Sequence, residues 1–258
     1  MTISHFPSSM DRHLWQHLDA RRHLLIALNI IAVIAGGLAL DIRFGWPGQH
    51  AATLWTIAVW TWLYRMGRPE ERRVLILCTA IAGCGEVVLS LGWGIYDYQF
   101  HNVPLFVPPG HALLMTLGLI VSQKLAELKA GRGFQAIFPW ISAIYAGFAW
   151  WAGFDRFGTL LFAVFAVCMI FGRSKMLYAT MFLLALLMEL YGTALGNWVW
   201  IAVTPGLNIS AWNPPFSAGA FYSLLDLLVL AALAAWPAAS AQAAVVTPAA
   251  DLAPEDSR

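Results

Sequence analysis

Three carboxylate side chains lie in apolar stretches of the sequence, where an ionised group is costly. Glu86, Glu189 and Asp226 each fall inside a run long enough to form a membrane helix, and no Lys or Arg falls at a similar depth. An ionised carboxylate near the centre of a bilayer costs about 2.5–3.5 kcal/mol even on lenient insertion scales. We therefore expect these groups to face the interior of a helix bundle, and all three are candidate catalytic residues. The alternative is that they only form hydrogen bonds between helices.

Each glutamate is followed four residues later by a hydroxyl side chain. Ser90 follows Glu86, and Thr193 follows Glu189. Residues four apart share one face of a helix, so each hydroxyl is placed to form a hydrogen bond with its glutamate. We expect Ser90 and Thr193 to be polar supports for the two carboxylates.

Two segments rich in aromatic residues, Pro and Gly follow the helices that carry the glutamates. The segments 93–111 and 197–215 contain no Lys or Arg. Backbone without hydrogen bonds is not tolerated in lipid, so we expect both segments to be rigid turns that form a lid over an apolar cavity. The predicted substrate-binding residues are Trp93, Tyr96, Tyr98, His111, Asn197, Trp198, Trp200 and Tyr222. His101 and His111 could also relay protons to the carboxylates. The alternative is an ordinary aromatic belt at the membrane surface.

The composition predicts a membrane protein. Apolar residues make up 60% of the 258 positions, charged residues only 11%, and the mean hydropathy is +0.67. Soluble domains carry about 25% charged residues, so this chain has too few charges to cover a soluble surface. The net charge of +1 gives no sign of a nucleic-acid partner. Cys78, Cys84 and Cys168 lie in apolar runs, and we interpret them as packing residues rather than as a disulfide or metal framework.

We predict an all-α fold with eight transmembrane helices, each near the ~20 residues that cross a bilayer. The predicted spans are 23–42, 50–66, 74–95, 108–126, 134–153, 158–172, 176–201 and 215–236. With eight spans, all fifteen Lys and Arg except Arg43 and Arg156 fall on one side. Cytoplasmic loops accumulate these residues, so both termini are predicted to be cytoplasmic in a multi-pass protein of a bacterial-type inner membrane.

An internal duplication divides the chain into two halves. The matches in chain order are Gly-Arg at 67–68 and 172–173, Glu-x-x-x-Ser/Thr at 86–90 and 189–193, an aromatic segment at 92–96 and 196–200, and Pro-Pro at 108–109 and 214–215. We predict two four-helix repeats, 23–126 and 134–236, between an N-terminal cytoplasmic segment 1–22 and a disordered cytoplasmic tail 237–258. An even number of spans in each repeat gives the two repeats parallel topology.

The region from Glu86 through Gly94-Ile-Tyr96-Asp-Tyr98 to Val103-Pro104 resembles the small polytopic carotenoid-biosynthesis proteins that include bisanhydrobacterioruberin hydratase. That family carries a Glu in a helix, then Phe-Gly-x-Tyr-x-Tyr and later Gly-Val-Pro. The stretch from Gly196 to Trp200 is similar to the family's Gly-x-Trp-x-Trp. A more distant likeness is to membrane cyclases, namely the heterodimeric lycopene cyclases and the fungal meroterpenoid cyclases.

Acid catalysis on a lipid is the chemistry that the residues predict and that the resemblance also implies. A carboxylic acid shielded from water can donate a proton to an alkene or an epoxide. Aromatic faces then stabilise the carbocation. Capture by water gives hydration, and attack by another alkene gives cyclisation. The resemblance implies a prenyl or carotenoid-type lipid from the bilayer, with Glu86 or Glu189 as the acid and the other as the base or the group that positions water.

Two other functions fit the same residues. Parallel repeats with paired intramembrane carboxylates also describe proton-coupled transporters of small or lipophilic solutes. A non-catalytic assembly factor of a membrane complex would use the glutamates only for contacts between helices. The sequence contains no Asp-Asp-x-x-Asp motif and only one His-x-x-x-His pair, His13 and His17, which lies ahead of the first predicted span. We therefore expect no metal and no cofactor, and we predict no particular oligomeric state.

Overall fold

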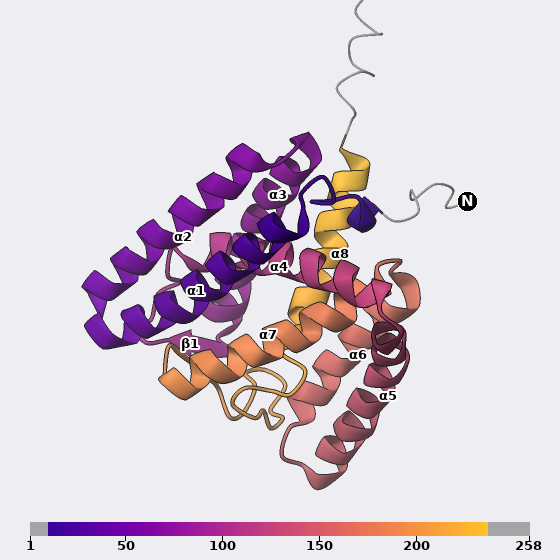
Figure 1. The fold of residues 1–258 in the computed structure, drawn as a ribbon. Helices are drawn as coiled ribbons and strands as arrows, with labels where there is room; N and C mark the ends of the chain where they lie inside the picture. Colours follow the sequence, from indigo (N-terminus) through magenta and orange to yellow (C-terminus); the bar gives the residue numbers. More distant parts are fainter. Residues whose placement is uncertain (1–9, 237–258) are drawn as a thin grey trace, which may run out of the picture.

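The computed structural model describes residues 10–236, which form eight α-helices together with short 3-10, π-helical and β elements (Figure 1). The α-helices are α1 (Ala20–Phe44), α2 (Trp46–Met66), α3 (Pro69–Glu86), α4 (Val107–Glu127), α5 (Lys129–Ala152), α6 (Arg156–Phe171), α7 (Lys175–Leu195) and α8 (Gly219–Ala235). The other elements are a 3-10 turn η1 (Met10–Arg12), a π-helix η2 (Val87–Trp93), and the strands β1 (Tyr96–Tyr98) and β2 (Trp198–Trp200). The all-α class is confirmed, with one two-stranded ribbon added. The predicted tail 237–258, and residues 1–9 of the predicted N-terminal segment, lie outside the described residues.

Four helices form the centre of the fold, and two helical hairpins flank them. α3 packs against α4 and α8, and α7 packs against the same two helices. The α1–α2 hairpin lies on one side of this centre and the α5–α6 hairpin on the other (Figure 1). The helices α3 and α7, which carry the two glutamates, therefore share both of their central neighbours.

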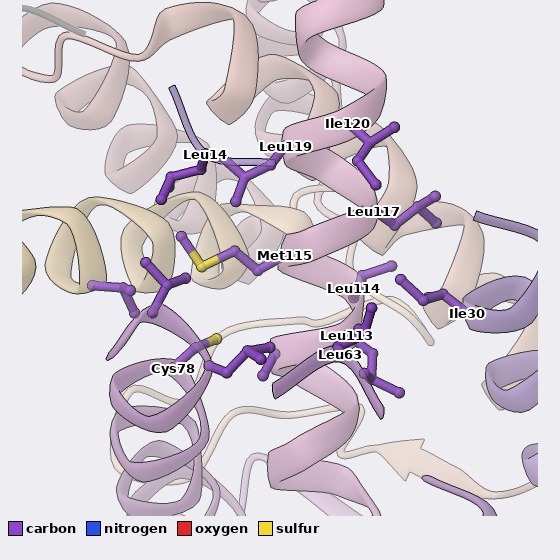
Figure 2. Packing of buried hydrophobic residues seen from close by; sticks show 14 of the residues in the cluster. Leu14, Ile30, Leu63, Cys78, Leu113, Leu114, Met115, Leu117, Leu119 and Ile120 are labelled. Carbon is purple, nitrogen blue, oxygen red and sulfur yellow. The ribbon is translucent and has the colours of Figure 1, made fainter. Parts of the chain in front are cut away.

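Helix α4 runs through the middle of the core. Every residue from Ala112 to Ile120 is buried. Its apolar side chains pack against others from the segment after η1 and from α1, α2 and α3 (Figure 2). A helix that is apolar on all sides belongs inside a bundle. Gly118 permits a close approach of α7, because a Cβ at this position would overlap the sulfur of Met181.

Three helices are long and apolar enough to cross a membrane. They are α1, α3 together with η2, and α7. Helices α6 and α8 are apolar but contain 16 and 17 residues. On α5, large apolar side chains at helical spacing are exposed at Ile137, Trp140, Ile141, Ile144, Phe148 and Trp151. An apolar face of this extent is typical of a surface that contacts lipid or another protein. The chain is a membrane protein, whereas the count of eight spans stays a prediction.

Two predicted spans extend too far, because both glutamate helices end before the aromatic segments. The predicted spans 74–95 and 176–201 continue into these segments. Helix α3 changes to a π-helix after Glu86 and ends at Gly94, whose φ is 72°. Gly196 ends α7 in the same way, with φ 89°. Glycine adopts this left-handed conformation without strain, and a residue in this conformation ends a right-handed helix.

Part of the predicted N-terminal segment 1–22 packs into the bundle. Trp15 is 1% exposed, and its backbone N–H donates to the Glu71 carboxylate at the start of α3. The other oxygen of Glu71 accepts the backbone N–H of Arg68 at 2.6 Å. Nε2 of His23 lies 2.8 Å from the Trp15 carbonyl oxygen. These contacts hold the chain ahead of α1, which begins at Ala20 rather than at residue 23.

Candidate functional site

Glu189 lies in α7, and two indole groups hold its carboxylate. Oε2 accepts hydrogen bonds from the Nε1–H groups of Trp198 at 2.8 Å and of Trp200 at 3.0 Å, both on β2. The hydroxyl of Tyr222 on α8 donates to Oε1 at 3.4 Å. Glu189 is 6% exposed. An indole N–H can only donate, so Oε2 must accept, and a proton on this carboxyl group has to sit on Oε1.

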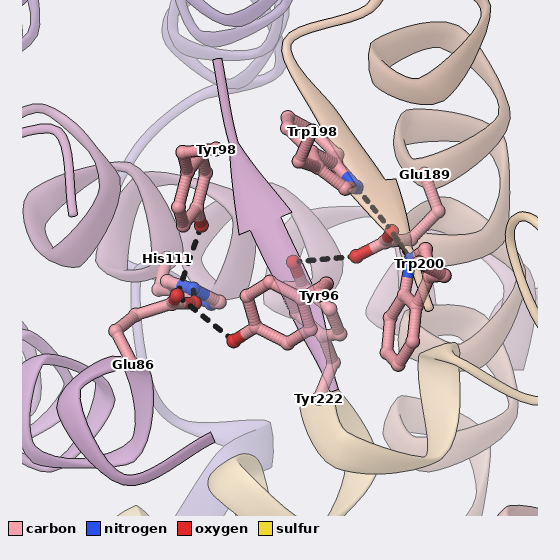
Figure 3. Close-up of polar contacts among 8 residues, drawn as sticks. All are labelled: Glu86, Tyr96, Tyr98, His111, Glu189, Trp198, Trp200 and Tyr222. Carbon is pink, nitrogen blue, oxygen red and sulfur yellow. Dashed lines mark hydrogen bonds and ion pairs between the residues drawn. The ribbon is translucent and has the colours of Figure 1, made fainter. Parts of the chain in front are cut away.

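Glu86 is the last residue of α3, and two phenols and an imidazole hold its carboxylate (Figure 3). Oε2 accepts hydrogen bonds from the hydroxyls of Tyr96 and Tyr98 on β1, both at 2.9 Å. Oε1 lies 2.9 Å from Nε2 of His111 on α4. The π-helix η2 begins directly after Glu86. Such π-helical turns occur frequently at functional sites.

The strands β1 and β2 form an antiparallel ribbon that joins the two clusters. Tyr96 lies opposite Trp200, and Tyr98 lies opposite Trp198. Because side chains alternate between the faces of a strand, the four aromatic rings share one face of the ribbon. Each glutamate thus receives two hydrogen bonds from aromatic residues on the strand that follows its own helix.

The structure aligns the two aromatic segments differently from the sequence match, which paired residues 92–96 with 196–200. In the structure, residue 94 rather than residue 92 is equivalent to residue 196. Gly94 and Gly196 are both left-handed, and each ends a glutamate helix. The strand residues that follow them then donate to the preceding glutamate in the same order. Gly94 is therefore equivalent to Gly196, Tyr96 to Trp198, and Tyr98 to Trp200.

His111 and Tyr222 lie between the two clusters. Their rings stack with centroids 4.8 Å apart and an interplanar angle of 27°. His111 contacts Glu86 and Tyr222 donates to Glu189, so the stacked pair connects the two carboxylates (Figure 3). Nδ1 of His111 is buried and has no hydrogen-bond partner among the described residues.

An apolar cavity of about 200 Å³ is lined by both clusters. Its walls come from α1, α2, α3, α4, α7, α8 and the ribbon. Neither Lys nor Arg occurs among the described residues that line it. Leu228 of α8 lines the cavity and is 43% exposed. The cavity wall at Leu228 therefore coincides with the outer surface of α8.

Two predicted substrate-binding residues, Trp93 and Asn197, do not line this cavity. Trp93 is 38% exposed, and its Nε1–H donates to the carbonyl of Pro205 at 2.8 Å. Asn197 donates from Nδ2 to Oδ2 of Asp41 at 2.9 Å and to the carbonyl of Leu38 at 3.0 Å. Asn197 immediately precedes Trp198 on β2, so its side chain takes the opposite face. Both residues hold the outer segments in place instead.

The predicted hydroxyl supports do not bind the carboxylates. Thr193 donates to the backbone carbonyl of Glu189 at 2.7 Å, a bond that threonine commonly makes within a helix. Among the described contacts, none joins the Ser90 hydroxyl to the carboxylate of Glu86. The π-helical turn explains this difference, because residue 90 no longer lies one α-helical turn after Glu86.

Asp226 does not join the two glutamates. It is 0% exposed on α8 and does not line the cavity. Neither carboxyl oxygen has a hydrogen-bond partner among the described residues. Within residues 10–236, no group of three or more His, Cys, Asp or Glu is arranged to hold a metal ion.

Asp155, which has no distinguishing pattern in the sequence, holds the second outer segment. It precedes α6 and accepts the backbone N–H groups of Gly158, Trp212 and Phe216 at 3.0, 3.1 and 2.9 Å. Burial raises the pKa of this carboxyl group, and the three backbone hydrogen bonds offset the rise in part. Asp155 therefore ties the segment after β2 to the start of α6.

Comparisons of the chain with protein families, with curated proteins and with solved structures find no match.

Proposed function

We propose that the protein is an integral membrane enzyme that uses Glu189 and Glu86 for acid-catalysed hydration or cyclisation of a prenyl or carotenoid-type lipid. One observation carries this proposal. Two carboxylates lie in a single apolar cavity, and aromatic side chains of one ribbon hold both of them. The exposed Leu228 in the cavity wall supports lateral access of a substrate from the bilayer.

Glu189 is the general acid in this proposal. Its Oε2 is occupied by two indole donors, which leaves Oε1 to carry the proton. Among the described contacts, Oε1 has one hydrogen bond, the long one that the Tyr222 hydroxyl donates at 3.4 Å. A proton on Oε1 therefore has little competition from protein acceptors, and it is placed for transfer to a substrate in the cavity.

Glu86 is the base. Both of its oxygens face side chains that can donate, and this is the environment of an ionised carboxylate. An ionised Glu86 can accept a proton from water or from a carbon next to a cationic centre. Nε2 of His111 and the two tyrosine hydroxyls keep this carboxylate oriented toward the cavity.

The reaction then follows a defined sequence of bond changes. Glu189 transfers its proton to one alkene carbon, the π bond breaks, and a carbocation forms on the other carbon. The rings of the ribbon stabilise this cation. In hydration, water adds to the cation and releases a proton to Glu86. In cyclisation, a second alkene attacks the cation, and the new cation loses a proton to Glu86. The proton returns to Glu189 before the next cycle.

The membrane arrangement proposed with this function has eight spans, as two four-helix halves of parallel topology with both termini in the cytoplasm. The equivalent partners of Glu86 and Glu189 support the duplication. The shared neighbours of α3 and α7 in the centre also support it. The placement of almost all Lys and Arg on one side supports the orientation and a bacterial-type inner membrane.

A proton-coupled transporter and an assembly factor are the competing functions. A transporter needs a polar route to both aqueous sides, whereas the described lining away from the two clusters is apolar except for Thr56. An assembly factor would need no cavity beside its glutamates. The apolar cavity therefore favours lipid chemistry over either alternative.

Lipid profiling tests the proposed function. Cells that supply acyclic polyprenyl or carotenoid lipids would express the wild-type chain, Glu86→Gln, Glu189→Gln and the control Glu127→Gln. The Glu127 side chain is 64% exposed at the end of α4. We expect a product that gains the mass of one water or that changes retention without a change of mass. Both site variants should lack this product and the control should form it. Unchanged products in both site variants would refute the proposal.

A further inference from the structure

We propose that the cavity also binds lipophilic ammonium ions, which are amphiphiles with one quaternary or protonated amine on an alkyl chain. This inference rests on the proposed function in one respect. The bound ammonium group would occupy the position beside the ribbon's rings where the proposed reaction forms its carbocation. Three features of the site support it, namely the shape of the aromatic wall, the charge of the site and the apolar remainder of the cavity.

The aromatic wall has the form of a box rather than a stack. The rings of Tyr96 and Tyr98 meet at 86° with centroids 5.8 Å apart. Tyr98 and Trp198 meet at 63°, and Tyr96 and Trp200 meet at 55°. Because neighbouring rings are steeply inclined to one another and all four line the cavity, ring faces as well as edges border it. Aromatic boxes of this kind bind quaternary ammonium groups through the negative potential of the ring faces.

The charges in the cavity favour a monovalent cation. Its titratable residues other than tyrosine are Glu86, Glu189 and His111, and the described lining contains no Lys or Arg. With one proton shared among these three groups, as on Glu189 in the proposed function, the site carries one net negative charge. A single ammonium ion neutralises this charge in a medium where an uncompensated charge is costly. A quaternary ammonium group needs no hydrogen-bond acceptor, so the existing bonds to both carboxylates can remain.

The rest of the cavity selects for an alkyl chain. Away from the two clusters, the described lining of the cavity is apolar except for Thr56. Leu224, Leu225 and Leu228 line it along α8, and Leu228 is exposed at the outer surface. A chain can therefore extend from the box toward the bilayer and bury apolar surface. A small cation without a chain would lack this contribution.

Calorimetric titration of the full chain in dodecyl maltoside micelles tests the inference. The probe is dodecyltrimethylammonium, and dodecanol and dodecanoate provide the same chain with a neutral and an anionic head. We expect saturable binding of the ammonium compound at one site. The other two amphiphiles should bind at least about tenfold more weakly, since only the cation gains from the rings and carboxylates. Equal affinity for all three would overturn the inference, and this comparison needs no variant.

Variants separate charge from ring effects. Glu86→Gln or Glu189→Gln should weaken binding of dodecyltrimethylammonium about tenfold or more, and the exposed control Glu127→Gln should leave it unchanged. Tyr96→Phe keeps the ring and should change the affinity less than about threefold, whereas Tyr96→Leu should lower it about fivefold or more. Affinity that is unchanged in both site glutamate variants would overturn the inference.

The outcomes for the two proposals are distinguishable. Ammonium binding that depends on the glutamates, without any lipid product, would support the cation site and contradict the proposed enzyme. A lipid product that depends on the glutamates, without ammonium binding, would support the enzyme and contradict the cation site.

Discussion

The hydrogen-bond partners of Glu86 and Glu189 differ in one chemical respect. Indole N–H groups only donate, whereas tyrosine hydroxyls and imidazole nitrogens can donate or accept. Oε2 of Glu189 is thus held by groups that only donate, whereas both oxygens of Glu86 face groups that can also accept. Two carboxylates in equivalent places can act in different roles because of this difference.

At the residue scale, the sequence predicted the glutamates and most of their aromatic partners. An acid inside an apolar run and an aromatic cluster without basic residues are strong local signals. The pairing of these residues was not predictable in the same way. Asn197 lies beside Trp198, and the alternation of side chains along the ribbon turns it away from the cavity. Trp93 is the last residue of η2, and its side chain donates to the Pro205 carbonyl outside the cavity.

Asp155 provides a test of what holds the outer segments. In Asp155→Ala, three backbone N–H groups lose their acceptor, and buried unpaired donors cost about 1–3 kcal/mol each. We expect a lower unfolding temperature in micelles and faster proteolysis between β2 and α8. Asp97→Ala is the matched control, because its carboxylate pairs with the exposed His101. Equal stability of the two variants would contradict this role of Asp155.

The raised pKa of Asp155 predicts a pH dependence. A carboxyl group whose pKa is higher in the folded state binds its proton more tightly there than in the unfolded state. Its contribution to stability is therefore greatest at low pH and falls as the pH rises from its ordinary pKa through the raised one. We expect the wild type to lose stability relative to Asp155→Asn across this interval in denaturant titrations. A relative gain would show that the backbone hydrogen bonds outweigh burial.

At the scale of elements, hydropathy located the helices but not all of their ends. Apolar residues continue past Gly94 and Gly196 into the two strands, so a hydropathy pattern extends both spans too far. The π-helix after Glu86 has no pattern that separates it from an α-helix. Its effect is large, because it changes which residues face the cavity after Glu86.

Gly94 and Gly196 should be sensitive to substitution for a conformational reason alone. A Cβ at Gly94 meets no atom closer than 3.9 Å, and none lies within 4 Å of one at Gly196. Both residues have positive φ, which costs a non-glycine residue about 1–2 kcal/mol. We expect Gly94→Ala and Gly196→Ala to lower the free energy of unfolding by about this amount.

Gly147 is the matched control for these two variants. It lies in α5, has open space for a Cβ and has no positive φ. Alanine is favoured over glycine inside a helix by about 0.5–1 kcal/mol, so Gly147→Ala should not destabilise the protein. Equal destabilisation at all three positions would show that the helix ends have no special conformational role.

At the scale of the whole molecule, the sequence predicted a helical membrane protein, and eight helices are present in residues 10–236. Only three of these meet a length and hydropathy criterion for a span. Helices α2 and α5 are rich in Trp, Tyr, Gly and Pro, which have low hydropathy values although they occur in membrane helices. Their mean hydropathy is lowered for this reason. Composition alone therefore leaves the number of spans open to experiment.

Cysteine labelling tests the proposed orientation. In a variant without its own cysteines, His101→Cys lies in the first outer segment and Glu127→Cys at the opposite end of α4. We expect a membrane-impermeant maleimide to label residue 101 in intact cells, and residue 127 only after permeabilisation. Labelling of both from the same side would contradict the proposed topology.

Proton transfer from Glu189 to substrate carbon is the central claim, and deuterium incorporation tests it most directly. The purified wild-type protein would be incubated in D₂O with the lipid identified by profiling, and the product analysed by mass spectrometry. We predict one carbon-bound deuterium in each hydrated product, because Glu189 exchanges its proton with solvent before each cycle. Glu189→Gln should form this product at least about a hundredfold more slowly. A product without carbon-bound deuterium, or one formed at the wild-type rate by Glu189→Gln, would contradict the claim.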